Sequence, residues 1–429
     1  MNTEIYPRAL VFANNCFSKT NSNGRTLAGF FDGFPKDKLA QFYIQSDTPD
    51  FELCNDYYCV TDAQALKSYF KRKPYGGIKN ENDFNYTNEP QSNKRHRKIK
   101  KTPISMKIRE RVWNARYWKG IAFDEWVSSF SPQIIILQAG DSAFMMKLAT
   151  DIAMQRNIPL VIYNSEDYYF KTKNYMKGAK ASGIFYKSFI KKFKKSFDYA
   201  IDYASASIYS SELLKRAYDE KFNKKSYFLY TSTKVREKNS MKNDEEVKVS
   251  YLGNLGVGRH ESLIAIANSL TQINPSYKLD VYGKIPNNLV KKALDNCAGI
   301  SYKGFISYDN VVEVMKSSTI LVHAENFSNF YKEDLKYAFS TKIADTMACG
   351  TCLFYYAPEG LASTEYLKAN ECACVVTDEK DLLISLKNIL SDKEKREAYI
   401  KNALGCVKVN HSSEKNRIEF LKILNDCLK

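Results

Sequence analysis

The chain has 429 residues, of which 44% are hydrophobic and 26% are charged. This composition is typical of a globular protein with two domains and excludes a disordered or fibrous chain. No run approaches the ~20 apolar residues of a membrane-spanning helix, and the segment before Arg8 lacks a signal-peptide core, so we expect a cytoplasmic protein. The ten cysteines are scattered among apolar runs and no His stands at ligand spacing, which argues against a disulfide framework and against a metal site.

The net charge of +16, from 64 Lys and Arg against 48 Asp and Glu, predicts a polyanionic neighbour. Nucleic acid, an anionic membrane surface and a phosphate-bearing substrate all satisfy that charge. The densest basic run, KRHRKIKK at residues 94–101, lies in a polar stretch that we interpret as an exposed loop. It carries no recognisable nucleic-acid motif, so nucleic acid is the least favoured partner.

The first half of the chain alternates apolar strands with helices, starting with the strand RALVFA at residues 8–13. A loop of Asn, Ser and Gly follows and ends in Gly24, Arg25 and Thr26, ahead of the first helix. Loops at the carboxyl ends of strands are where open α/β domains bind ligands, so these three residues are candidates for contacting a substrate. A simple turn glycine is the alternative for Gly24.

Acidic residues follow two other buried strands in the same half. The strand QIIILQA is followed by Gly140, Asp141 and Ser142, which open a helix, and the strand PLVIY is followed by Glu166 and Asp167. A strand, helix and strand in this order form a βαβ unit, whose ligand edge then carries all three carboxylates. All three are candidate catalytic bases. For Asp141, capping of the following helix by Asp141 or Ser142 is an equally good explanation.

Residues 185–204, FYKSFIKKFKKSFDYAIDYA, form an amphipathic basic helix with phenylalanines four apart. Its aromatic stripe either packs into the domain core, the commoner outcome, or dips into an anionic bilayer. A peripheral contact with the inner face of the cell membrane is therefore one possible role.

A charged segment without apolar period, residues 233–246, separates this half from a second series of strands and helices. We therefore predict an α/β protein with two Rossmann-like domains, at residues 1–235 and 245–410, followed by a terminal helix at residues 411–429.

The stretch FSTKIADTMACGTCLFYYAPEG at residues 339–360 predicts a polar turn, a short helix and a buried strand. Ser340 or Thr341 can cap the helix, its N-terminus attracts phosphate, and Lys342 adds a positive charge. Asp345, one turn further on, can accept hydrogen bonds from a ribose diol. An ordinary capped helix is the competing interpretation.

The turn GNLGVGRH, at residues 253–260, is a second anion-ready helix start. Its spacing is GxxGxG, which does not match the dinucleotide fingerprint GxGxxG, so a dehydrogenase is disfavoured. With Gly253, Asn254, Gly256 and Gly258 in the turn and Arg259 beside it, we expect both helix starts to bind one diphosphate.

These two segments resemble those of the GT-B glycosyltransferases, particularly the family 4 enzymes of bacterial capsule and exopolysaccharide assembly. That family carries G-R-L-x-x-x-K-G after the first strand of its second domain and E-A-M-A-C-G-T-P-V later. Here Asn254 replaces the arginine, Arg259 replaces the lysine, and D-T-M-A-C-G-T-C-L places Asp345 at the ribose-binding glutamate. Tyr337 stands where the family has a second acid, and Glu325 is the candidate to replace it.

The resemblance implies two Rossmann-like domains facing across a cleft, with a glycan or lipid-linked acceptor bound by residues 1–235 and a UDP-sugar donor bound by residues 245–410, and with neither cofactor nor metal. It also implies that Gly24, Arg25 and Thr26 bind the acceptor. By the same resemblance the helix at 411–429 packs back on the first domain; an ordinary terminal helix is the alternative. Arg259, Lys342 and the helix N-terminus would stabilise the departing diphosphate. His323, at the end of the strand TILVHA, could touch the donor or be structural. Retention of configuration is implied; an inverting enzyme would use Asp141, Glu166 or Asp167 as base. The alternatives are an RNA- or polyanion-binding module with a degenerate nucleotide site and a nucleotide-sugar epimerase.

Overall fold

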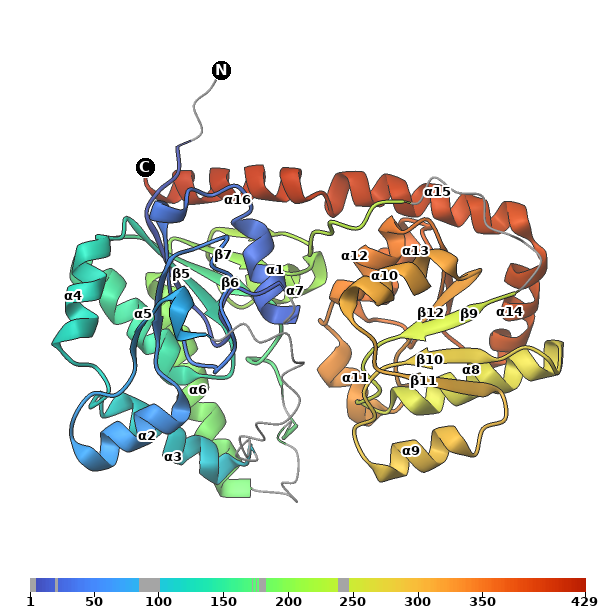
Figure 1. Ribbon diagram of the computed structural model, residues 1–429, viewed down its shortest axis with the longest axis horizontal. Helices are drawn as coiled ribbons and strands as arrows, with labels where there is room; N and C mark the ends of the chain where they lie inside the picture. Colours follow the sequence, from blue (N-terminus) through green and yellow to red (C-terminus); the bar gives the residue numbers. More distant parts are fainter. Residues whose placement is uncertain are drawn as a thin grey trace. The chain divides into compact units, whose positions relative to one another are not determined.

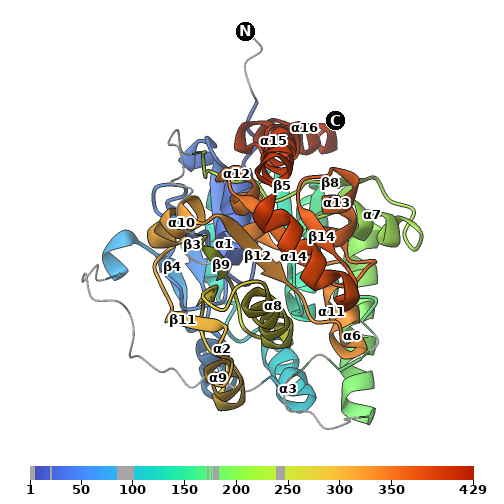
Figure 2. The ribbon, with the colours of Figure 1, turned by 90° about the vertical axis from the view of Figure 1, so that its right-hand side faces the viewer.

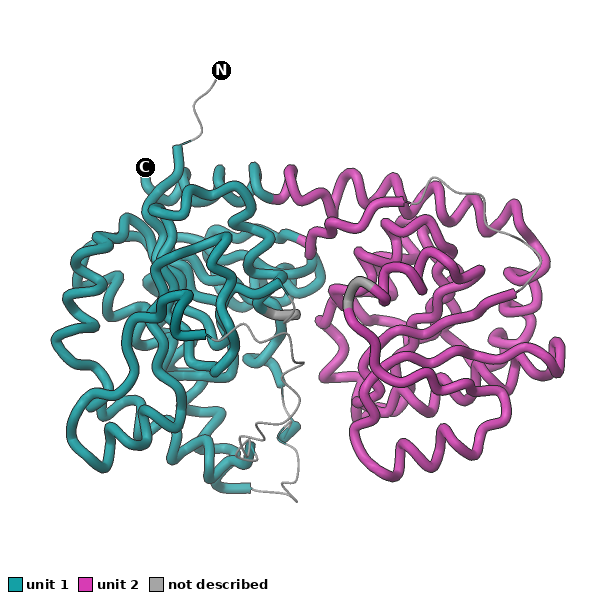
Figure 3. Tube along the Cα trace, in the orientation of Figure 1, with its two compact units in different colours: residues 1–229, 417–429 teal, residues 230–416 magenta. Residues whose placement is uncertain are grey.

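The computed structural model describes residues 5–19, 22–84, 101–171, 173–174, 176, 183–237 and 247–429. The basic run at 94–100 and most of the predicted linker, residues 238–246, lie outside these ranges. The chain divides into two compact units (Figure 3): unit 1 contains residues 1–229 and 417–429, and unit 2 contains residues 230–416. Each unit is a sheet covered by helices, so the predicted α/β class with two Rossmann-like domains is confirmed.

Unit 1 is built on an eight-stranded sheet of order β4-β3-β2-β1-β5-β6-β7-β8, in which only β4 is antiparallel to its neighbour. Its strands are β1 (Ala9–Phe12), β2 (Leu39–Tyr43), β3 (Asp56–Cys59), β4 (Gly77–Lys79), β5 (Ile134–Ala139), β6 (Leu160–Asn164), β7 (Ala206–Tyr209) and β8 (Ser226–Phe228). Its helices are α1 (Ser22–Phe30), α2 (Asp62–Lys71), α3 (Pro103–Asn114), α4 (Ile121–Phe130), α5 (Ala143–Arg156), α6 (Gly183–Tyr203) and α7 (Glu212–Asp219), with most of α16 (Ser413–Cys427).

The two faces of this sheet pack against different helices (Figures 1 and 2). Helices α2, α3, α5 and α6 contact one another in series, with α5 against β5 and β6, and form one layer. The other face packs on α1 and α16, where Phe420 lies 5.3 Å from the ring of Phe30 and 5.1 Å from that of Phe31, centroid to centroid. The last helix of the chain thus completes the core of unit 1.

Unit 2 has a six-stranded parallel sheet of order β11-β10-β9-β12-β13-β14. The strands are β9 (Val249–Leu252), β10 (Leu279–Tyr282), β11 (Ile300–Gly304), β12 (Ile320–Ala324), β13 (Cys352–Tyr356) and β14 (Cys374–Val376). The helices are α8 (Arg259–Ile273), α9 (Asn288–Asp295), α10 (Tyr308–Ser317), α11 (Asn329–Leu335), α12 (Thr341–Ala348), α13 (Ala362–Ala369), α14 (Leu382–Ser391) and α15 (Lys393–Asn410).

Alternate residues of these strands point to opposite faces of the sheet and pack into two separate hydrophobic cores. Val249, Val281 and Phe354 face α8, α9 and α14, whereas Leu353 and Tyr355 face α12, α13 and α15. Both faces are apolar, as the continuous hydrophobic runs of a parallel sheet require. Within the described ranges, no helix combines the length and the apolar content that crossing a bilayer demands.

A buried polar cluster in unit 2 joins the start of the unit to its last helices. His411 is fully buried, with Nδ1 2.7 Å from the carbonyl oxygen of Thr231 and Nε2 3.0 Å from the hydroxyl of Tyr366. The first contact requires a proton on Nδ1, and in the neutral imidazole Nε2 then accepts from the hydroxyl of Tyr366. Burial lowers the pKa of His411 to about 4.

The stability of unit 2 should therefore fall on acidification. The pKa of His411 is lower in the folded than in the unfolded protein, so on acidification the unfolded state binds a proton first. The stability that is present above the unfolded pKa is therefore lost as the pH falls toward about 4. His411→Gln should reduce that loss by about 3 kcal/mol. Urea unfolding of both proteins at neutral pH and near pH 4 measures the difference; equal losses would contradict the prediction.

Candidate functional site

The candidate site of unit 2 lies where the strand order reverses, between β9 and β12. From β9 the chain proceeds to β10 on one side, whereas β12 begins the other half of the sheet. The loops that follow two such strands separate and leave a crevice, which is where open α/β sheets bind ligands. The β9–α8 turn, residues 253–258, and the end of β12 with residues 325–326 meet at this point.

The β9–α8 turn is held tightly by its own side chains. Oδ1 of Asn254 accepts a hydrogen bond from the backbone of Gly256 at 2.9 Å, so this side chain shapes the turn. Gly258 has φ +70°, and a Cβ there would lie 2.5 Å from Nδ2 of Asn326. Val257 also has a positive φ, 59°, which is uncommon for a β-branched residue and marks strain.

Helix α8 starts from this turn without a side-chain cap, because its N-cap residue is Gly258. The first N–H groups of a helix have no partner within the helix and attract anions. The first residue of α8 is Arg259, so a full positive charge accompanies the positive end of the helix dipole.

Arg259 is fixed by a bidentate ion pair with Glu325, which follows β12. Nε and Nη2 of the arginine each lie 2.8 Å from a different oxygen of the carboxylate. Nε2 of His323 lies 3.1 Å from Oε1 of the same glutamate, and its ring stacks on that of Tyr355 at 5.2 Å. All of these side chains are largely buried, so the pair is shielded from solvent.

The charges of the pair depend on each other. Burial raises the pKa of Glu325, but the hydrogen bond from His323 and the charge of Arg259 outweigh it, so the pKa stays below its usual value. For Arg259, burial lowers the pKa but Glu325 raises it, with a net upward shift. Both groups are thus ionised, and the pair presents an oriented guanidinium beside the N-terminus of α8.

The second predicted helix start, α12, differs from the prediction in its capping. Ser340 occupies the N-cap position, but its side chain makes no capping bond, so the predicted cap by Ser340 is wrong. Thr341 and Lys342 are half-buried in the first turn of α12.

Asp345 lies inside unit 2, and 3% of it is exposed. Its Oδ1 accepts a hydrogen bond of 2.7 Å from the hydroxyl of Thr233. Thr233 in turn accepts a backbone hydrogen bond from Val235 at 3.0 Å. The carboxylate that the sequence predicts to bind a ribose therefore anchors the segment that enters unit 2.

The three predicted carboxylates of unit 1 have different surroundings. Oδ2 of Asp141 accepts from Lys101 at 2.7 Å, and the exposed Glu166 accepts from Tyr168 at 2.8 Å. Oδ1 of the buried Asp167 accepts three hydrogen bonds: from the backbone of residues 169 and 170 and, at 2.9 Å, from the hydroxyl of Tyr218.

The predicted cap of α5 by Asp141 or Ser142 is wrong. Oγ of Ser142 accepts from Arg109 at 2.8 Å and does not cap the helix, and the buried Glu110 of α3 lies close to the start of α5. Burial raises the pKa of Glu110 to about 6. Sequence reasoning missed this residue, because a glutamate on an amphipathic helix gives no sign of burial.

Gly24 does not end a loop, because α1 already begins at Ser22. A Cβ on Gly24 would lie 2.3 Å from the carbonyl oxygen of Cys16, so the residue allows α1 to approach the loop after β1. Arg25 and Thr26 follow in the same helix. Their role in acceptor binding stays a prediction.

Two residues that contact the predicted site residues, Asn326 and Thr233, belong to no motif that would have identified them from the sequence. Asn326 donates to the carbonyl of Gly258 at 2.8 Å and to Oε2 of Glu261 at 2.9 Å, which locks the turn to β12. Thr233 holds Asp345, although 112 residues separate the two. Within the ranges that the structure describes, no group of three or more metal-ligating side chains is present.

The sequence of unit 2 resembles one known family. Residues 259–422 match the family model described as Glycosyl transferase-like. No curated protein sequence matches the chain.

Several solved structures align with the chain over nearly its whole length. HepE from Anabaena, in complex with UDP, aligns with a TM-score of 0.63 and 10% identity over 97% of this chain and 99% of that one. Sucrose-phosphate synthase from Thermosynechococcus elongatus aligns with a TM-score of 0.63 and 12% identity, over 97% and 98%. A glycosyltransferase from Rickettsia africae aligns with a TM-score of 0.55 and 13% identity, over 98% of each chain. The chain shares their fold. The predicted GT-B class of two Rossmann-like domains is thereby confirmed, and a likeness at these identities concerns fold alone.

Removal of Arg259 should destabilise unit 2 strongly. Arg259→Met leaves Glu325 buried with His323 alone, and we expect a loss of about 3 to 5 kcal/mol in unfolding free energy. Adding Glu325→Gln removes the uncompensated charge and should restore much of that loss.

Urea unfolding of the two single variants and the double variant measures this coupling. Lys291→Met, which breaks the exposed pair with Asp295 on α9, is the matched control and should change stability by less than about 1 kcal/mol. Additive effects of the two substitutions at Arg259 and Glu325 would show that the pair is not coupled.

Proposed function

We propose that the protein is a glycosyltransferase that binds a UDP-sugar in unit 2. The observation that carries the proposal is Arg259, held by Glu325 at the start of α8 in the crevice between β9 and β12. A diphosphate needs positive charge and N–H donors converging from one side, and both are present there. The family match over residues 259–422 and the UDP in the HepE complex support this choice of donor.

The start of α12 supplies the second half of the proposed diphosphate site. Val257 of the β9–α8 turn packs against the apolar cluster that contains Phe339 and Ile343, which flank this helix start. Turn and helix are thus parts of one packed body, and Lys342 lies in the first turn of α12. Ser340 and Thr341 would contact the phosphates through their backbone or hydroxyl groups.

The chemistry proposed for this site is electrostatic. As the bond between the anomeric carbon and the diphosphate oxygen breaks, negative charge grows on the departing UDP. Arg259, Lys342 and the two helix N-termini stabilise that charge, and their fixed orientation avoids a reorganisation penalty during the reaction. No metal is required in this scheme.

Glu325 and His323 act on the donor side of the proposed mechanism. Glu325 orients the guanidinium of Arg259, and His323, which lies beside the same carboxylate, is proposed to contact the donor. Asp345, which accepts a hydrogen bond from Thr233, is the carboxylate proposed to bind the ribose.

We propose retention of the anomeric configuration, with the leaving phosphate receiving the acceptor proton. An inverting enzyme needs a free carboxylate base in the acceptor domain. Asp141 is paired with Lys101, and Asp167 accepts three hydrogen bonds, so neither is poised to take a proton. Glu166 is the most accessible of the three.

The acceptor is proposed to be a glycan or a lipid-linked oligosaccharide that binds unit 1 near Gly24, Arg25 and Thr26. A role in capsule, exopolysaccharide or surface-glycan assembly follows from the sequence resemblance. The net charge of +16 suits a protein that works in the cytoplasm at an anionic membrane surface.

UDP binding tests the donor site. Calorimetry without metal should detect UDP binding, and Lys342→Ala should weaken it by about 1 to 3 kcal/mol because a charged hydrogen bond to phosphate is lost. Lys387→Ala on the exposed side of α14 is the control and should leave the affinity unchanged. If neither UDP nor another nucleotide or sugar nucleotide binds, the transferase proposal fails.

The anomeric configuration of the product tests the mechanism. Proton NMR of the first turnover should show the same configuration in the product as in the donor, and Glu166→Gln should leave the rate within about threefold. A rate loss of a hundredfold or more, the usual consequence of losing a general base, together with an inverted product would identify Glu166 as the base.

A further inference from the structure

The outer side of α6 is a basic surface that the proposed chemistry does not use. The aromatic stripe of this helix points inward: Phe189, Phe193 and Phe197 are each at most 2% exposed. Core packing, the commoner of the two outcomes expected for this stripe, is therefore confirmed. It follows that the lysines between these aromatic residues face away from the core.

Five lysines occupy this outer side within three helical turns. They are Lys187, Lys191, Lys192, Lys194 and Lys195. Within the described part of the chain none of the five forms an ion pair. Like charges this close repel one another, so the surface gains free energy when an anionic partner approaches.

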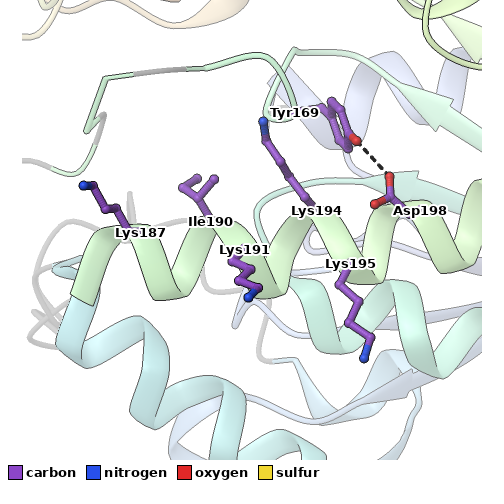
Figure 4. Close-up of a pocket in the computed structure, with 7 residues that line it drawn as sticks. All are labelled: Tyr169, Lys187, Ile190, Lys191, Lys194, Lys195 and Asp198. Carbon is purple, nitrogen blue, oxygen red and sulfur yellow. Dashed lines mark hydrogen bonds between the residues drawn. The ribbon is translucent and has the colours of Figure 1, made fainter. Parts of the chain in front are cut away.

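Two hollows flank the lysines and extend the basic surface. The first, of about 520 Å³, is lined by four of them with Tyr169, whose hydroxyl donates to Asp198 at 2.9 Å (Figure 4). The second, of about 530 Å³, places Lys192 together with Arg72 and Arg111. Each hollow offers cations to a phosphate group.

An apolar tip adjoins these hollows, where α3 and α6 lie side by side (Figures 1 and 2). Met106 of α3 packs in one cluster with buried aromatic residues of α6. Around this joint Ile184 is 81% exposed and Phe185 47%, on α6, and Ile104 is 52% exposed and Ile108 56%, on α3. The ammonium of Lys107 lies 5.4 Å from the ring centroid of Phe185, so charge and apolar surface are interleaved.

We propose that this α3–α6 face docks the protein on an anionic phospholipid bilayer. The proposal rests on the proposed function, because it names the surface at which a lipid-linked acceptor is met. Lysines and arginines bind the headgroup phosphates, and the four exposed apolar side chains enter the boundary between headgroups and acyl chains. Apolar side chains at the tip favour a bilayer over RNA, which would reward the cations but not exposed isoleucines.

Vesicle flotation without nucleotide tests this inference. The full chain should bind phosphatidylglycerol-containing vesicles and not pure phosphatidylcholine vesicles. Lys187→Gln, Lys191→Gln and Lys195→Gln together should weaken binding about 100-fold, at roughly fivefold for each lysine near the surface. Ile184→Ser with Phe185→Ser should weaken it by about tenfold, and this loss should persist at high salt, where charge is screened.

The control is a triple variant with the same change in net charge: Lys387→Gln, Lys401→Gln and Lys408→Gln on the exposed sides of α14 and α15. It should bind vesicles as the wild type does. Equal weakening in both triple variants, or single-stranded RNA binding that only the α6 variant loses while vesicle binding is retained, would overturn the proposal. UDP affinity, measured on the same preparations, should be unchanged, which separates a failure of docking from a failure of the donor site.

Discussion

The pairing of Arg259 with Glu325 is the interaction on which the crevice of unit 2 depends. A guanidinium at the start of α8 would repel the helix dipole if it stood alone, and a carboxylate buried after β12 would be strongly destabilising. Together they connect the strands on either side of the sheet's reversal point. Asn326, which follows β12, donates a hydrogen bond to the same turn, and Val257 in that turn has a strained backbone conformation. The ion pair, the strained residue and the reversal of strand order thus all lie at the crevice between β9 and β12.

Much of the fold was predictable because it is encoded locally. Continuous apolar runs such as residues 134–139 and 352–356 can only be strands of a sheet covered on both faces, and both form β-strands. The two anion-ready helix starts were also identified from short segments, because glycine spacing and the run before Gly350 are local features. Short elements such as α11 (Asn329–Leu335) were missed, since its seven residues show no clear hydrophobic period.

The candidate site was less predictable because its partners are distant in sequence. Glu325 is 66 residues from Arg259, and nothing in the intervening sequence signals their pairing. The capping error at Ser142 has the same origin: its hydroxyl accepts a hydrogen bond from Arg109 of α3, so the group that local rules assign to a helix start is used elsewhere. Local rules predict what a residue can do, whereas tertiary contacts decide which of these options is used.

The contribution of α16 to the core of unit 1 has a consequence for biosynthesis. Residues 1–229 leave the ribosome first, but Phe30 and Phe31 find their partner Phe420 only after unit 2 has been made. At roughly 5 to 20 residues per second, about 190 intervening residues take on the order of 10 to 40 s. Throughout that interval an aromatic surface of unit 1 stays uncovered, so the exposure of nascent chains to association grows longer as elongation slows.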